Sequence, residues 1–200
     1  MNNSRKIKHL GRISIFILVC VALVWNCGDK VTNPQAKLQD LYFTTQITGW
    51  VPDSSSHFVQ YPPDSLFNFI DGPAQRYIDS GLVSWFREKM NGGPTATPVG
   101  GDYAFGGYVH DYGTTVKAKA LYGAKIAANI TPFPSAKVTL GQYSDNEAQA
   151  SAVGGGIQVY ATFGTLYFEF NITGFTVSQI STIAVPEALK FLDKYKATIY

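Results

Sequence analysis

The last third of the chain contains the pattern that most restricts the fold. Residues 157–163 and 166–172 are two apolar-rich runs, and Gly164-Thr165 between them is a two-residue turn typical of a β-hairpin. The alternating apolar positions are Ile157, Val159 and Ala161 in the first run and Leu166, Phe168 and Phe170 in the second. Because such alternation places one face of each strand against a core, the sequence predicts an antiparallel sheet.

Other segments add strands and helices to this hairpin. Turn residues delimit further expected strands over residues 41–50, 82–90, 102–112, 137–143 and 147–153. Helices are expected over residues 65–81, from Thr114 or Thr115 to about 129, and over residues 185–197. The order predicts an α+β fold, with an antiparallel sheet of meanders and hairpins and about three helices packed on it in a single domain.

The first of these helices is interrupted. Apolar residues recur at spacings of three and four between Leu66 and Ile78, but Gly72-Pro73 lies inside the pattern. Since proline removes a backbone donor and clashes with the preceding turn, we expect a kink or two short helices, with Pro73 opening the second. Gly81 is well placed to terminate it.

The N-terminus has the plan of a bacterial secretion signal. Basic residues between Arg5 and Arg12 precede an apolar run of 13 residues that ends at Trp25, and Cys27 follows. The run is shorter than the roughly 20 residues of a membrane-spanning helix and fits a signal peptide. The segment 23–27 resembles the lipobox of bacterial lipoproteins, although Trp25 and Asn26 depart from it. That resemblance implies acylation of Cys27; an ordinary signal peptide or an uncleaved anchor are the alternatives.

This interpretation sets the expected organisation of the chain. It comprises a signal peptide over residues 1–26, a lipidated Cys27 with a polar tether to residue 40, and one domain over residues 41–200. Removing residues 1–26 leaves 12 Lys and Arg against 14 Asp and Glu, a formal charge of −2. That balance gives no reason to expect nucleic-acid binding. Cys27 would be the only remaining cysteine, so a disulfide is excluded.

The helix over residues 65–82 carries a family resemblance. Its sequence, SLFNFIDGPAQRYIDSGL, resembles a motif of a family of uncharacterised bacterial proteins, many of them lipoproteins. In that family the helix reads Leu-Tyr-x-Tyr-Ile-Asn/Asp-Gly-Gly-Ala-Glu-x-Tyr, and Val109-His-Asp-Tyr-Gly113 is similar to its downstream strand end. This chain departs from the motif at Pro73 and at Gln75-Arg76. The resemblance implies no activity; the element order is also similar to Mog1/PsbP-like domains, an analogy of fold alone.

Candidate sites are few. Asp71 and Asp79 are not expected to act as a catalytic pair, and Asp71, Gly72 and Tyr77 remain candidate motif residues, with Gly72 allowing close helix–sheet approach and Asp71 bonding backbone. His110 and Asp111 would point to opposite faces of a strand. Two histidines, His57 and His110, remain in the processed chain, too few for a usual zinc site. We therefore expect no catalytic residues, metal or cofactor.

The most plausible binding surface is aromatic. Tyr103, Phe105 and Tyr108 lie in a glycine-rich strand and could form a surface for a sugar or a hydrophobic ligand, in a cleft beside the helix over residues 71–77. The sequence thus predicts a non-enzymatic interaction domain, held on the membrane of the cell envelope by acyl chains on Cys27 and facing the periplasm or the outer surface. Its partner would be an envelope protein; a small-ligand-binding lipoprotein is the alternative, and a hydrolase comes last.

Overall fold

The structure is a computed structural model that describes residues 37–43, 47–53, 57–70, 72–92 and 103–200. All of these residues belong to one compact unit. The lipidation site predicted at Cys27, and Asp71 of the motif, lie outside the described residues.

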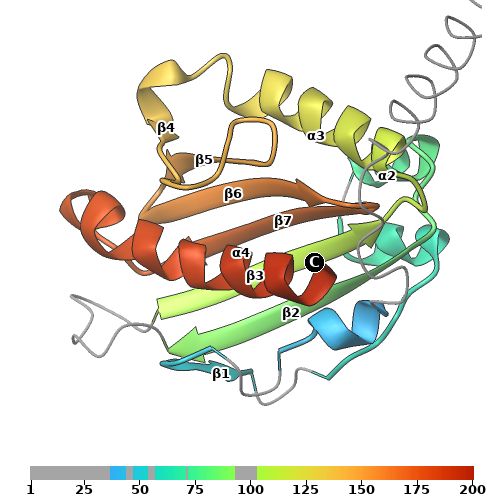
Figure 1. Ribbon diagram of the computed structural model, residues 1–200, viewed down its shortest axis with the longest axis horizontal. Coiled ribbons are helices and arrows are strands. Elements are labelled where there is room, and N and C mark those ends of the chain that lie inside the picture. The colour runs from blue at the N-terminus through green and yellow to red at the C-terminus, as the bar shows by residue number, and fades with distance from the viewer. Residues whose placement is uncertain (1–36, 44–46, 54–56, 71, 93–102) are drawn as a thin grey trace, which may run out of the picture. The chain divides into compact units, whose positions relative to one another are not determined.

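A seven-stranded antiparallel sheet forms the centre of this unit (Figure 1), with the strand order β1-β2-β3-β7-β6-β5-β4. The strands are β1 (Trp50–Pro52), β2 (Ser84–Gly92), β3 (Tyr103–Asp111), β4 (Lys137–Val138), β5 (Ala148–Val153), β6 (Gly156–Phe163) and β7 (Leu166–Thr173). The long strands β2, β3, β7 and β6 lie side by side, although β3 and β7 are far apart in sequence.

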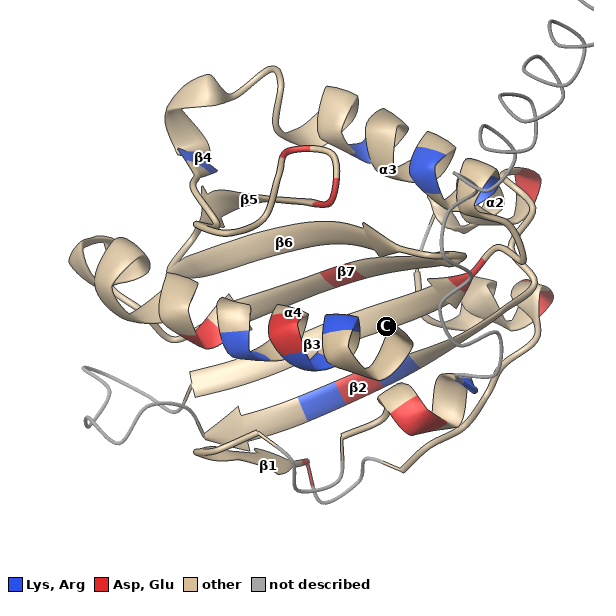
Figure 2. Ribbon diagram, viewed as in Figure 1, with Lys and Arg blue, Asp and Glu red and all other residues tan. Residues whose placement is uncertain are grey.

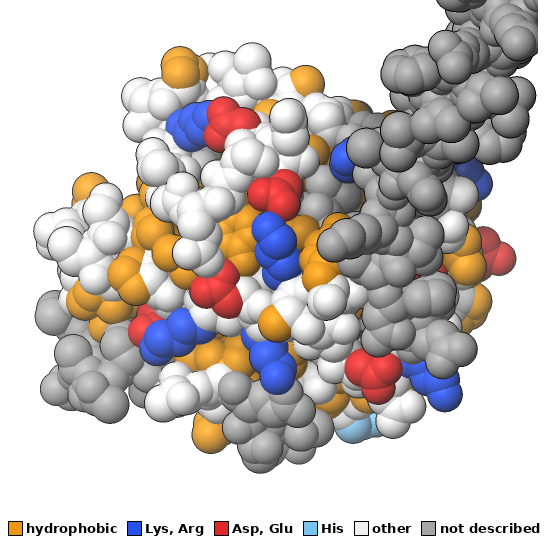
Figure 3. Space-filling model, viewed as in Figure 1, with side chains coloured by type: hydrophobic (Ala, Val, Ile, Leu, Met, Phe, Trp, Pro, Cys, Tyr) orange, Lys and Arg blue, Asp and Glu red, His pale blue; other side chains and the backbone are white. Residues whose placement is uncertain are grey.

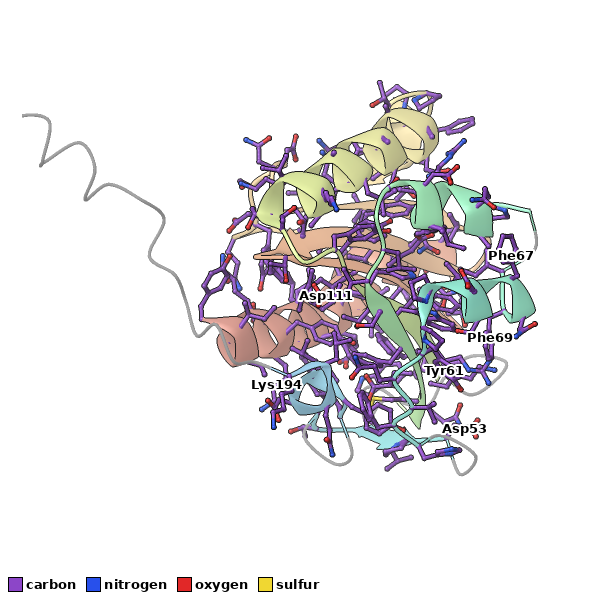
Figure 4. The ribbon with its side chains drawn as sticks, turned by 90° about the vertical axis from the view of Figure 1, so that its right-hand side faces the viewer. Asp53, Tyr61, Phe67, Phe69, Asp111 and Lys194 are labelled. Atoms are coloured by element: carbon purple, nitrogen blue, oxygen red, sulfur yellow. The ribbon has the colours of Figure 1, made fainter. Side chains whose placement is uncertain are left out.

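Helical segments cover both faces of the sheet. The α-helices are α2 (Ala74–Asp79), α3 (Thr115–Asn129) and α4 (Val185–Ile199). Short 3-10 helices are η1 (Leu38–Leu41), η2 (Pro63–Asn68), η3 (Pro134–Ala136) and η4 (Val177–Gln179), and a π-helical turn, η5 (Ile180–Ala184), leads into α4. Figure 4 shows α4 on one side of the sheet and η2, α2 and α3 on the other.

Each face has its own core. On the α4 side, aromatic rings of the sheet pack on the helix; the Phe105 ring stacks on Phe191 with 4.0 Å between centroids. On the other side, residues of η2, α2 and α3 enclose a second cluster around Trp85 and Tyr167, both fully buried. One face is therefore closed by α4, while the other is closed only where these three helical segments reach.

The predicted fold class is confirmed. The helix over residues 65–81 is indeed two short helices, η2 and α2, and Pro73 is the residue that caps α2. Gly81 has a φ of 87°, which suits a terminating glycine. Thr114 accepts a hydrogen bond from the Lys117 backbone N–H and so caps α3 as expected.

Two strands were predicted wrongly or too long. In the expected strand over residues 41–50, Leu41 ends η1 and Trp50 begins β1, and residues 44–46 lie outside the described residues. Leu41, Tyr42 and Phe43 are consecutive buried residues and so do not show the alternation of a strand with one buried face. The strand expected over residues 137–143 ends at Val138. The folded unit also starts earlier than residue 41, since Leu38 in the expected tether is buried in the α4-side core.

No helix among the described residues combines the length and apolar character needed to cross a bilayer.

Candidate functional site

Polar side chains cross the sheet in rows on the face opposite α4. One row consists of Arg87, Tyr108, Glu169 and Tyr160, from β2, β3, β7 and β6. The next row consists of Lys89, Gly106, Asn171 and Gln158 from the same strands. The helical segments bury the neighbouring row that contains Trp85 and His110, whereas Lys89 and Asn171 are exposed to solvent. Half of this face is therefore open.

A groove of about 260 Å³ lies on this open half. The polar residues that line it include Arg87, Lys89, Tyr108, Gln158, Glu169 and Asn171, with Gly106 between β2 and β7. A Cβ added at Gly106 would meet the Asn171 side chain, 3.1 Å from its Oδ1 atom. Because Gly106 has no side chain, the floor of the groove above β3 is low at this residue. We call the groove lined by these residues the open groove.

Glu169 is held in a fixed position by three donors. Its Oε2 atom accepts hydrogen bonds from the Tyr77 hydroxyl at 2.7 Å and the Tyr167 hydroxyl at 2.8 Å. The Lys125 ammonium lies 3.2 Å from the same oxygen and also donates to the Tyr77 hydroxyl. Within the described residues no hydrogen bond reaches Oε1, and Glu169 is one of the residues that line the groove. The carboxylate is therefore oriented from behind with one oxygen still free to accept.

The two phenols behind Glu169 stay protonated at neutral pH. Burial raises the pKa of Tyr77 far above its ordinary value, and the negative charge of Glu169 raises it further. The pKa of Tyr167 is raised for the same two reasons. Because both phenols keep their protons, they remain donors, and Glu169 can act toward the groove only as an acceptor.

His110 lies under this network without taking part in it. The imidazole is fully buried, and neither ring nitrogen has a hydrogen-bond partner among the described residues. Its ring stacks on Tyr108, with centroids 6.0 Å apart, and on Tyr167, with centroids 5.8 Å apart. Burial, with the charge of Lys125, lowers the pKa of His110 to about 3, so the ring is neutral. It serves here as a flat packing element that sets the position of Tyr108.

Positive charge borders the groove on β2. The Arg87 guanidinium lies over the Phe69 ring, 4.6 Å from its centroid, which orients its plane. Figure 4 shows Tyr61, Phe67 and Phe69 on this side of the sheet, and Figure 2 shows positive charge on β2 and negative charge in β7. Within the described part of the chain neither Arg87 nor Lys89 forms an ion pair. Both cations are available to a ligand.

On the α4 side of the sheet, by contrast, most of the lysine side chains form ion pairs. Two of the three lysines of α4 are paired, Lys190 with Glu187 and Lys196 with Glu147, each at 2.8 Å, and Lys194 forms no ion pair among the described residues. Figure 3 looks onto this side and shows positive and negative side chains interspersed over α4, with hydrophobic surface between them. The shallow hollows beside α4 therefore offer a surface of mixed charge.

The structure brings together two of the residues named from sequence. Tyr77 holds Glu169 from behind, and Tyr108 lines the groove itself. Gly72 is exposed with a φ of 66°, and a Cβ there would meet nothing within 4 Å. The expectation that Gly72 permits close helix–sheet approach is therefore wrong; its role is the left-handed backbone between η2 and α2.

The predicted aromatic surface is also wrong. Tyr103 and Phe105 are each 2% exposed and pack on the α4 side, where Tyr103 stacks on Phe175 with 4.3 Å between centroids. Tyr108 faces the opposite side of the sheet, because residues an odd number of positions apart in a strand point to opposite faces. The three rings therefore cannot form one surface, and Tyr103 and Phe105 belong to the core.

Sequence reasoning missed most of the groove. β7 reads Leu-Tyr-Phe-Glu-Phe-Asn-Ile, in which Tyr167, Glu169 and Asn171 alternate with apolar residues and so share a face. In β2, Arg87 and Lys89 share a face in the same way. This alternation was visible, but nothing local says that β3 joins the two strands.

No cluster of three His, Cys, Asp or Glu side chains suited to a metal ion occurs among the described residues.

Comparisons with known proteins identify no family for this chain. No family model matches the chain, and no curated protein matches it. The extracellular domain of PknH from Mycobacterium tuberculosis is similar in structure, with 12% identity, a TM-score of 0.38, and coverage of 75% of this chain and 86% of that one. A likeness at this level carries no argument about the present chain.

Proposed function

We propose that this protein is a lipid-anchored, non-enzymatic binding domain of the bacterial cell envelope that holds a small polar ligand in the open groove. The observation that carries the binding function is the groove itself, in which Arg87 and Lys89, which form no ion pair within the described part of the chain, stand opposite the oriented carboxylate of Glu169. The anchor and the address rest on the sequence around Cys27, and the membrane is one partner through its acyl chains.

The dimensions favour a small ligand over a protein partner. Ligand pockets are usually about 300–1,000 Å³, and this groove, at about 260 Å³, is close to the lower limit. A stable protein interface buries roughly 800 Å² on each side and has an apolar centre. The groove is lined mainly by charged and amide side chains, which suits a polar molecule of a few atoms or one unit of a polymer.

The side chains also favour binding over catalysis. A general base must be able to exchange a proton with the ligand. Glu169 accepts from two phenols and an ammonium group at Oε2 and presents only Oε1 to the groove, and the buried ring nitrogens of His110 have no hydrogen-bond partner among the described residues. These groups are arranged to hold a ligand rather than to transfer its protons.

Photo-crosslinking in living cells tests this function. A photoreactive amino acid replaces Thr173, which lies beside the groove on the same face of β7 as Asn171, and a matched variant carries it at Lys119, which is exposed on α3. We expect an adduct of defined mass at position 173 and none at position 119. Equal labelling at both positions, or none at position 173, would contradict the proposed role of the groove.

A further inference from the structure

The charge pattern of the groove excludes a simple anion as its best ligand. Arg87 and Lys89 project from the same face of β2 and attract negative charge. The carboxylate of Glu169 lies on β7, and β3 separates the two strands, which are therefore about 9–10 Å apart. Burial raises the pKa of Tyr108, Arg87 lowers it and Glu169 raises it, as expected for a phenol between these charges. A phosphate or sulfate ion near Arg87 would be attracted by Arg87 and Lys89 and repelled by the carboxylate of Glu169.

A matching ligand thus needs two different groups. Next to β2 it must present an anion, which a guanidinium held over Phe69 can bind with parallel N–H groups. Next to β7 it must present a donor, because Glu169 Oε1 can only accept. A hydroxyl group meets that need without adding charge.

The amides favour several hydroxyl groups over a single ammonium. Asn171 and Gln158 are cross-strand partners, and neither side chain has a hydrogen-bond partner among the described residues. Each amide offers both a donor and an acceptor, as does a hydroxyl group. An amino acid would satisfy Arg87 and Glu169 but leave both amides unused, whereas neighbouring hydroxyl groups on a ring would engage them.

The floor of the open groove and its volume fit a ligand with one saccharide ring. Gly106 leaves space above β3, and the half-buried Tyr108 beside it is held by its stack on His110. Such a fixed aromatic ring offers a flat apolar surface for the C–H face of a saccharide ring. A volume of about 260 Å³ holds one such unit and not a long chain.

We infer that the open groove binds a carboxylate-bearing saccharide, with the carboxylate on Arg87 and Lys89 and the ring hydroxyls on Glu169, Asn171 and Gln158. This inference rests on the proposed function and adds the ligand class. The ligand is a free sugar acid or a single unit of an acidic polysaccharide, since the groove is open to solvent.

Calorimetric titration of the full chain in detergent micelles tests the inference. The probes are galacturonic acid, trigalacturonic acid, galactose, glutamate and inorganic phosphate. We expect both acids to bind at least tenfold more tightly than galactose, glutamate or phosphate. Tighter binding of the trimer than of the monomer identifies a polymer as the source, and equal binding identifies the free sugar acid; either supports the inference.

Variants locate the site. Arg87→Gln should weaken binding of the acids at least tenfold and remove their advantage over galactose, because it removes the oriented cation. Gly106→Val should block binding by filling the floor, since a side chain there meets only the flexible end of Asn171. Lys119→Gln, at an exposed position of α3, should bind as the unmodified protein does.

Three results would overturn the inference: galactose binding as tightly as galacturonic acid, glutamate or phosphate binding more tightly than the acids, or no effect of Arg87→Gln. If no acid binds but crosslinking at position 173 persists, the ligand class is wrong and the binding function stands. If crosslinking at position 173 is also absent, the binding function fails with it.

Discussion

Glu88 provides a quantitative test of the packing on the α4 side. Its side chain is 1% exposed and accepts hydrogen bonds from the Phe43 backbone N–H at 2.7 Å and from the Tyr195 hydroxyl at 3.4 Å. Burial raises the pKa of Glu88 from 4.5 to about 8, although both hydrogen bonds act in the opposite direction. The carboxyl group is therefore protonated in the native state at neutral pH.

The direction in which Glu88 changes the stability with pH follows from the difference between its pKa in the folded and the unfolded protein. Above pH 4.5 the unfolded chain releases this proton while the folded protein keeps it until pH 8, so Glu88 lowers stability progressively across that window. Each unit of pKa difference corresponds to about 1.4 kcal/mol. Between pH 5 and pH 9 the cost grows by about 4 kcal/mol, a large part of the stability of an ordinary domain.

Replacing Glu88 by glutamine removes this dependence. Its amide can accept from Phe43 N–H and donate to the Tyr195 oxygen, so Glu88→Gln should match the original protein at pH 5 and be about 4 kcal/mol more stable at pH 9. Urea denaturation followed by tryptophan fluorescence at several pH values measures the difference. A difference that stays constant from pH 5 to pH 9 would show that Glu88 is ionised in the folded state and refute the reasoning.

Glu147→Gln is the matched control. Glu147 pairs with Lys196 at 2.8 Å, and this bond is the main cause of its lowered pKa. A carboxylate with a lowered pKa adds stability above its unfolded pKa and loses it as the pH falls. Glu147→Gln should therefore be less stable than the original protein at neutral pH, with a difference that shrinks in acid, opposite in sign to Glu88→Gln.

Three further predictions follow from other positions. In the original protein, the free energy of unfolding should fall as the pH drops from 6.5 toward 3, because the unfolded chain binds a proton at His110 and the folded protein, with a pKa of about 3 there, does not. His110→Phe should make this fall smaller. Urea denaturation at several acidic pH values measures it, and the same dependence on pH in both proteins would contradict the prediction. Gly107→Ala should cost about 1–3 kcal/mol, because its Cβ would lie 2.8 Å from the Cβ of Phe170, whereas Gly106→Ala should be close to neutral; equal thermal denaturation of the two variants would disprove the difference. Cys27→Ala should release the protein from the membrane fraction and abolish incorporation of labelled palmitate, and a membrane-bound, labelled variant would argue against lipidation there.

The hairpin of β6 and β7 was predictable because its signals are local. Gly164-Thr165 sets the turn, and the structure pairs Val159 with Phe170 and Ala161 with Phe168 on one face. Short-range alternation and a defined turn together fix the register. The same holds for the break at Pro73, where the missing donor of proline acts on its own helix.

The groove could not be predicted because its residues meet only through long-range pairing. Arg87, Gly106 and Asn171 come from three strands, and β3 pairs with β7 across more than 50 intervening residues. The choice of Tyr103 and Phe105 as surface residues was a different kind of error. Their spacing from Tyr108 already implied opposite faces, and in the structure Phe105 packs on Phe191 of α4 and Tyr103 on Phe175.

Native mass spectrometry of the protein extracted gently from its own membrane tests the central claim most directly, when the original sequence is compared with Gly106→Val. The account predicts residues 27–200 with acyl chains and a bound small molecule of saccharide mass, and the same lipidated chain without that molecule in the variant. The same adduct on both proteins would contradict the claim that the open groove is the binding site.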